Sequence, residues 1–165
     1  MAPLYAPEEG EFAVYRVLRA GQSEVRPLDV SFGNGVRLTG YENRLSQAQP
    51  AGSGDQLGVF LYWTSRQPIA ERLKVFVHIV DEQGELVGQH DSEPQVGGYP
   101  TNEWKAGESV CDFHLVSLGR RLPPGAYAIR VGLYQESTGQ RVGITAAKNQ
   151  ASVDNAVEIG TLTIK

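Results

Sequence analysis

The sequence has little that could crosslink it or carry it into a membrane. It contains one cysteine, so no internal disulfide can form. No apolar run approaches the roughly 20 residues that a membrane-spanning helix needs. The N-terminus, MAPLYAPEEGEF, lacks the basic-then-apolar order of a signal peptide. We therefore expect a soluble chain with no direct membrane insertion.

Positive charge is also scarce. The formal net charge is −4 at pH 7 and the isoelectric point is about 5.4. Such a chain has no broad positive field that would neutralise phosphates or hold it on an anionic membrane. We expect no nucleic acid partner.

The length of 165 residues fits one domain and is enough to bury a core without crosslinks. We predict a single domain over residues 1–165. Residues 1–28 form an N-terminal lead that contains an edge strand.

Helical periodicity is rare, whereas short apolar segments closed by Gly, Pro, Asn or Asp are frequent, which is typical of strands and turns. Residues 44–55 and 145–156 are polar and are predicted to be loops. This pattern predicts an all-β fold, a two-sheet antiparallel β-sandwich that is immunoglobulin-like or jelly-roll-like. The predicted strands are residues 12–19, 36–43, 56–65, 73–82, 86–92, 109–118, 125–136, 140–144 and 157–164.

Two turns and one strand are the best-defined local features. Asp81-Glu82-Gln83-Gly84 predicts a hairpin turn, and Pro123-Pro124-Gly125 begins a strand. In residues 56–65, apolar side chains occupy both alternating faces, so this strand is predicted to be central in its sheet, with Trp63 in the core.

Several short motifs follow one another in a distinctive order: Phe76-Val77-His78, His90-Asp91, Gly98-Tyr99-Pro100-Thr101, Trp104 with Gly107-Glu108, and Leu122-Pro123-Pro124-Gly125-Ala126-Tyr127. With this series, the chain from Asp29 to Lys165 resembles the C-terminal, extracytoplasmic β-sandwich module of bacterial membrane glycosyltransferases of the dolichyl-phosphate-mannose or aminoarabinose transferase type. The resemblance implies a fold, an extracytoplasmic location and a glycosyltransferase catalytic region as partner. It implies no activity for the module itself.

Residues 97–108, GGYPTNEWKAGE, combine aromatic and polar residues without strand or helix periodicity. A sugar site needs aromatic rings for stacking and polar groups for the hydroxyls. Tyr99 and Trp104 supply the rings; the polar candidates are Thr101, Asn102, Glu103 and Glu108. Alternatively, Trp104 plugs one end of the sandwich and uses its N–H for one structural hydrogen bond. We favour the structural interpretation, and a buried Trp104 would remove the main argument for a sugar site.

His90 and Asp91 complete the candidate ligand-binding set. Acid–base chemistry needs a histidine oriented by a carboxylate, and a metal site needs three or four converging ligands; with His78 on the preceding strand, neither requirement is met. We predict that His78 packs or hydrogen-bonds within the sheet and that His90 and Asp91 fix the backbone before a turn. No metal site, catalytic residue or cofactor is predicted.

Three other possibilities are less favoured. The acids Glu93, Glu103, Glu108 and Asp112 are not paired as glycoside hydrolysis requires. A calcium site in the turn containing Asp81, Glu82, Gln83 and Glu85 has no consensus spacing, so a solvated hairpin tip is preferred. A catalytic thiol at Cys111 would need a base and exposure, so Cys111 is predicted to be a small buried apolar residue instead.

The sequence thus favours a non-catalytic accessory domain that binds a glycan, or helps to present one, beside a membrane glycosyltransferase. The alternative is a structural or protein-interaction domain without a ligand. A glycoside hydrolase is the third and least favoured hypothesis.

Overall fold

The computed structural model describes residues 24–46, 55–118 and 121–165, and these residues form an all-β fold without α-helices. Two short 3-10 helices, η1 (Pro94–Gly97) and η2 (Thr101–Glu103), connect β5 to β6. The strands are β1 (Arg26–Phe32), β2 (Val36–Ser46), β3 (Gln56–Ser65), β4 (Leu73–Val80), β5 (Leu86–Ser92), β6 (Ser109–Ser117), β7 (Gly125–Gln135), β8 (Ile144–Ala147), β9 (Ser152–Val153) and β10 (Ala156–Ile164).

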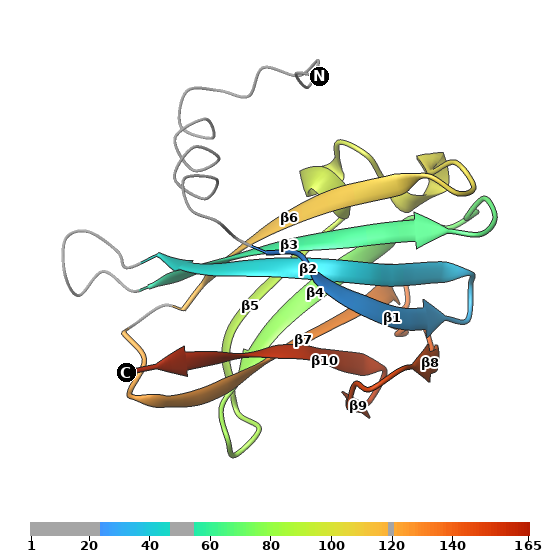
Figure 1. The fold of residues 1–165 in the computed structure, drawn as a ribbon. Helices are drawn as coiled ribbons and strands as arrows, with labels where there is room; N and C mark the ends of the chain where they lie inside the picture. The colour runs from blue at the N-terminus through green and yellow to red at the C-terminus, as the bar shows by residue number, and fades with distance from the viewer. Residues whose placement is uncertain (1–23, 47–54, 119–120) are drawn as a thin grey trace.

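The described strands belong to one sheet, in the order β8-β1-β2-β3-β6-β5-β4-β7-β10-β9. The sheet curves into a nearly closed barrel, so that β1, β2, β3 and β6 lie across the core from β5, β4, β7 and β10 (Figure 1). The all-β, antiparallel prediction is confirmed. A sandwich of two sheets, immunoglobulin-like or jelly-roll-like, is not confirmed, because hydrogen bonds join the two halves through β5 and β6.

The joint between β5 and β6 is narrow. β6 pairs with β3 along its length, from Gln56↔Ser117 to Thr64↔Ser109, whereas its pairing with β5 consists of Gln89↔Ser117. Beyond that pair the two strands diverge, and η1 lies against β6. We call residues 89–92 of β5 and 111–117 of β6 the β5–β6 seam.

The core follows from the period-2 alternation of the strands. Val75, Val77 and Ile79 of β4 point inward, as do the alternating apolar residues of β7. β3 is paired on both edges and buries Phe60 as well as Trp63, which confirms that this strand is central and that Trp63 is a core residue. The inner side chains of both halves form a single cluster.

Most predicted strands are present. β3 and β5 have the predicted bounds, and β4, β6, β7 and β10 differ by at most a few residues. β1 was not predicted, because Pro27 and Asp29 interrupt its apolar pattern; a register shift lies between Pro27 and Val30. The predicted strand at residues 12–19 lies outside the described residues.

The prediction for the C-terminal region is wrong in part. Residues 140–143 form no strand apart from an isolated bridge between Arg141 and Tyr134. Apart from Ile144, β8 and β9 instead lie within the predicted loop of residues 145–156. β8 pairs with β1, more than a hundred residues earlier in the chain, so its partner is supplied by the tertiary structure.

The two predicted turns are confirmed. In the β4–β5 hairpin, Asp81 Oδ1 accepts hydrogen bonds from the amides of Gln83 (3.0 Å) and Glu85 (2.8 Å), and Gly84 has a φ of 84°. Before β7, the Tyr127 hydroxyl donates to the carbonyl of Pro123 at 2.8 Å. Asp81 therefore caps its own turn.

Candidate functional site

The loop of residues 97–108 connects η1 to β6, and its backbone is fixed by internal hydrogen bonds. The amides of Glu103 and Trp104 donate to the carbonyls of Pro100 (3.0 Å) and Thr101 (3.3 Å). Gly107, with a φ of 79°, donates its amide to the carbonyl of Ser65 at the end of β3 (2.8 Å). The positive φ favours glycine at this position, and the bond ties the loop to the central strand.

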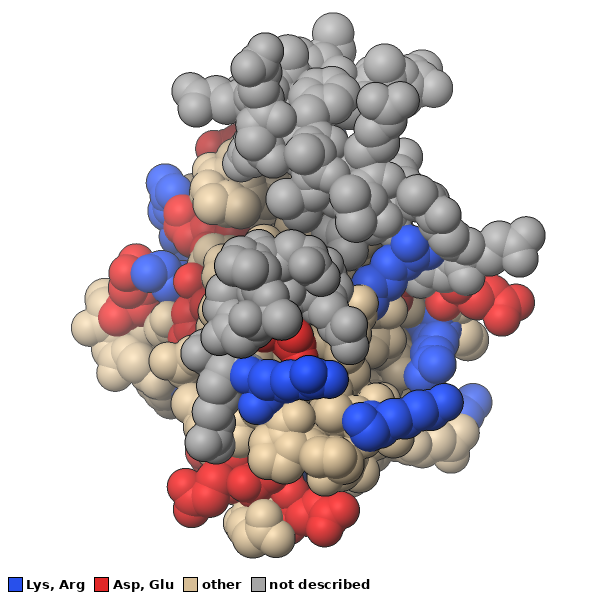
Figure 2. Space-filling model, turned by 90° about the vertical axis from the view of Figure 1, so that its left-hand side faces the viewer, with Lys and Arg blue, Asp and Glu red and all other residues tan. Residues whose placement is uncertain are grey.

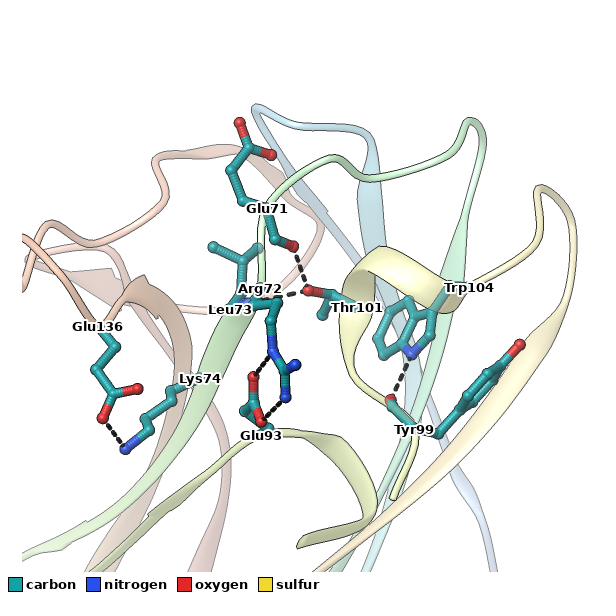
Figure 3. A network of polar contacts seen from close by, with 9 residues as sticks. All are labelled: Glu71, Arg72, Leu73, Lys74, Glu93, Tyr99, Thr101, Trp104 and Glu136. Atoms are coloured by element: carbon teal, nitrogen blue, oxygen red, sulfur yellow. Dashed lines mark hydrogen bonds and ion pairs between the residues drawn. The ribbon is translucent and has the colours of Figure 1, made fainter. Parts of the chain in front are cut away.

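Trp104 is directed into the molecule. Its side chain is 3% exposed and belongs to the main hydrophobic cluster. Its Nε1 donates to the carbonyl of Tyr99 at 3.0 Å, across the loop (Figure 3). The ring is therefore not available to stack on a ligand at the surface.

Thr101 fastens the same loop to β4. Its side chain is fully buried, and its hydroxyl donates to the carbonyl of Glu71 (2.6 Å) while accepting the amide of Leu73 (3.0 Å) (Figure 3). One hydroxyl thus satisfies two backbone groups where β4 begins. This role leaves no hydrogen-bonding capacity directed at solvent.

Tyr99 and Glu108 close the loop from its two ends. The Tyr99 hydroxyl donates to Glu108 Oε2 at 2.8 Å and lies 3.1 Å from the carbonyl oxygen of Glu103. The amide of Lys105 donates to the same carboxylate oxygen at 2.9 Å. The carboxylate of Glu108 raises the pKa of Tyr99, and the bonds from Lys105 and Tyr99 lower the pKa of Glu108.

Two ion pairs lie beside the loop, near the start of β4 (Figure 3). Arg72 makes a bidentate pair with Glu93, with distances of 2.6 and 2.7 Å. Its guanidinium lowers the pKa of Glu93. Lys74 pairs with Glu136 at 2.5 Å. Of the predicted residues in the loop, Asn102 and Glu103 have exposed side chains.

His90 and Asp91 point to opposite faces of β5, as neighbours on a strand must. Asp91 lies on the outer face, where His78 Nε2 is 3.6 Å from its Oδ1. Burial alone would raise the pKa of Asp91, but the contacts with His78 and Tyr134 lower it. His78 also packs on Phe76, with ring centroids 4.7 Å apart. His90 and Asp91 therefore do not form one acid–base pair.

The inner face of the β5–β6 seam carries a chain of three ionisable side chains. His114 Nε2 lies 2.7 Å from Asp112 Oδ2, and His114 Nδ1 lies 2.9 Å from His90 Nδ1. Asp112 and His114 are 0% exposed. Burial, and then the neighbouring His114, lower the pKa of His90. We call Asp112, His114 and His90 the seam triad.

Sequence reasoning did not single out His114. Asp112 and His114 alternate with Val110 and Val116 on the buried face of β6, so the signal was two polar residues on an otherwise apolar face. The same alternation places Cys111 on the outer face, where it is exposed. The prediction that Cys111 is buried is therefore wrong.

Asp112 has a second contact, to η1. Its Oδ1 accepts the amide of Gln95 at 2.8 Å, and Gln95 Nε2 donates to the carbonyl of Cys111 at 3.0 Å. Gln95 and Val96 in η1 both have a φ of 55°, a conformation that non-glycine residues seldom adopt. η1 thus covers the part of β6 that β5 does not reach.

Other kinds of site have little support in the described part of the chain. Its His, Cys, Asp and Glu residues form no group of three or more that could hold a metal ion. None of its helices is long and apolar enough to cross a membrane. Figure 2 shows Lys and Arg side chains beside Asp and Glu side chains on one face of the molecule.

The sequence matches no family model and no curated protein. Among solved structures, it is similar to a β-glucuronidase from glycoside hydrolase family 2, with a TM-score of 0.45 and 9% identity. The match covers 62% of this chain and 10% of that chain. A likeness this weak supports no argument about activity.

Proposed function

We propose that this chain is a non-catalytic accessory domain that acts as a structural or protein-interaction module. We further propose that residues 97–108 are a structural loop, here called the pin, that ties the end of β3 to the start of β4. The burial of Trp104 carries this proposal. A sugar site in the loop would depend on an accessible ring, but Trp104 is in the core and its N–H is used by Tyr99. Thr101, Tyr99 and Glu108 likewise bond to the protein itself.

The proposal that the domain is non-catalytic rests on accessibility. Asp112 and His114 would be the natural acid–base pair, but both side chains are fully buried. General acid–base chemistry requires the catalytic group to lie within hydrogen-bond reach of a substrate proton. Of the exposed acids, Glu103 lies in η2 and Asp91 lies on β5 beside His78. The two are not paired as a catalytic acid and base would be.

The sequence resemblance supplies the proposed context. An extracytoplasmic module of a membrane glycosyltransferase would space or dock the catalytic region of that enzyme. The finer fold assignment belongs to this proposal as well: the bond from Tyr127 to the Pro123 carbonyl resembles the tyrosine corner of immunoglobulin-like sandwiches.

A glycan array tests the pin against the sugar site. The isolated domain is screened beside Asn102→Ala and Glu103→Ala, which remove the exposed polar side chains of the loop and leave its buried contacts in place. We expect no glycan whose binding depends on either residue. A glycan that binds the parent domain and is lost in both folded variants would overturn the proposal in favour of carbohydrate binding.

The partner is tested separately. If the reading frame that encodes this chain, or one beside it, also encodes a multi-helix membrane region, that region and the domain should copurify in detergent. Their failure to associate would remove the glycosyltransferase context, while the pin would stand on the array result.

A further inference from the structure

The seam triad lies where the sheet is held most weakly. β5 and β6 share the pair Gln89↔Ser117, yet directly beside it the His90 and His114 rings join the two strands through side chains. The rings are 5.1 Å apart between centroids and nearly perpendicular, at 75°. The two imidazoles therefore extend the contact between the strands beyond the backbone ladder.

The hydrogen bonds determine how many protons the triad can hold. Asp112 Oδ1 accepts the Gln95 amide, and Oδ2 lies 2.7 Å from His114 Nε2, which is the geometry of a carboxylate that accepts from the Nε2–H tautomer. His114 Nδ1 then accepts, and His90 Nδ1 must donate. With both imidazoles neutral, every contact in the chain is satisfied, and the net charge of the triad is that of the carboxylate.

A first added proton is tolerated. It makes one imidazole positive and balances the charge of Asp112, and one hydrogen still lies between the two Nδ1 atoms. A second added proton places N–H groups on both sides of a 2.9 Å contact and leaves a net positive charge in the core. Like charges so close, one of them on the fully buried His114, are strongly unfavourable. The rings must then separate.

We propose that the seam triad is a pH-sensitive latch: it holds β5 against β6 while at most one of its imidazoles is charged, and releases β5 when both are protonated. The latch is independent of the proposed role as an accessory module. Its release would expose the facing edges of β5 and β6, which are backbone groups able to pair with another strand.

The other groups around the latch do not supply a compensating charge. Opposite His90 on β4 is Val77, and opposite His114 and Asp112 on β3 are Val59 and Leu61, all apolar. From η1, Asp112 receives the Gln95 amide. Asp91 acts on His90 from the outer face of β5, where it is engaged with His78 and Tyr134. A doubly protonated pair therefore has one buried carboxylate to balance it.

The first test is nitrogen-15 NMR of the imidazoles in the intact domain between pH 8 and pH 5. We expect His114 as the Nε2–H tautomer and His90 as the Nδ1–H tautomer at pH 8, with their titrations coupled. Amide hydrogen exchange in β5 and β6, corrected for the intrinsic effect of pH, should accelerate at pH 5 relative to β2 and β3. Independent titration of both rings at the ordinary value near 6.5, without a change in seam exchange, would overturn the proposal.

The second test uses denaturant unfolding between pH 5 and pH 7.5, where carboxyl groups contribute little. Unfolded histidines bind protons below about pH 6.5, and the folded pair resists the second one, so stability falls as pH falls. The unfolding equilibrium constant should rise by up to about tenfold per pH unit for one proton of difference. His90→Asn places a non-titrating donor near Nδ1 and should flatten this slope.

His78→Asn is the matched control, because His78 lies on the outer face of the adjacent strand and outside the triad. Its slope should remain steeper than that of His90→Asn. A flat slope in His78→Asn with a parental slope in His90→Asn would refute the latch. If His90→Asn does not fold, the tautomers and exchange rates of the parent domain decide the question.

Discussion

The loop of residues 97–108 and the β5–β6 seam both place polar groups against the core, but they do so with different chemistry. The buried polar groups of the loop are neutral: an indole N–H bonded within the loop, and a threonine hydroxyl bonded to the backbone where β4 begins. The seam uses a buried carboxylate, a buried imidazole and the partly exposed imidazole of His90. The loop should therefore respond to pH weakly, and the seam strongly.

The comparison also shows that amino-acid composition and the position of a side chain in the fold can point to different functions. The loop has the composition of a binding site, with aromatics, acids and glycines close together, yet its main ring is buried. The seam has an unremarkable strand sequence, yet it holds the fully buried ionisable pair of the described residues, Asp112 and His114. Composition alone does not tell whether a polar group faces a ligand or the protein.

The largest effect is expected for Trp104→Ala, which should lower the free energy of unfolding by about 3–5 kcal/mol, as aromatic-to-alanine changes in cores do. The variant loses a buried ring and the bond to the Tyr99 carbonyl. Urea unfolding measures the change. Asn102→Ala, in the same loop but exposed, should change stability by less than about 0.5 kcal/mol. A small loss in Trp104→Ala would contradict the pin.

Asp112→Ala should follow, with a loss of about 2–3 kcal/mol, because hydrogen bonds to a charged group contribute roughly 1.5–3 kcal/mol. The change removes the acceptor of both the Gln95 amide and His114 Nε2. Urea unfolding at pH 8 measures the loss. Glu136→Ala, at an exposed ion pair with Lys74, is the control and should cost far less.

Thr101→Val should cost about 1–2 kcal/mol. Valine has nearly the same shape but cannot accept the Leu73 amide, which would then be buried without a partner. Thermal or urea unfolding gives the value. Thr161→Val, at an exposed position of β10, tests for a general effect of the substitution and should be close to neutral. Equal losses in the two variants would mean that the Thr101 hydroxyl is not a fastening point.

Tyr99→Phe should have the smallest effect, about 0.5 kcal/mol near pH 7, because the hydroxyl lies in a partly exposed part of the loop. The pH dependence is more informative. Since the pKa of Glu108 is below its unfolded value of 4.5, its contribution is present above about pH 4.5 and is lost as pH falls through the folded pKa.

Without the hydroxyl, less of that contribution remains to be lost. The difference between parent and Tyr99→Phe should therefore shrink as the pH is lowered from 5 toward 3 in the same unfolding assay. A difference that stays constant over this range would mean that the Tyr99–Glu108 bond does not depend on the charge of the carboxylate.

Much of the local structure could be predicted. Alternation placed β3, β4, β5 and β7, and glycine and proline placed their turns, because these signals depend on a few neighbouring residues. β1 and β8 were not predicted, since Pro27 and Asp29 weaken one and the other is short and pairs far away in the chain. Tyr99, Trp104 and Glu108 were grouped correctly in one loop, but the direction of the Trp104 ring depends on the core beneath it.

By itself, the sequence determined that this chain makes antiparallel strands with a continuous apolar face, because side-chain alternation and turn residues are local properties. The tertiary structure alone decided that one sheet curves into a barrel and that β5 meets β6 at a single pair. That meeting brings His90 to His114 and Asp112 from positions more than 20 residues away. The physical reason is that register between distant strands is set by the packing of the whole core, which no short stretch of sequence encodes.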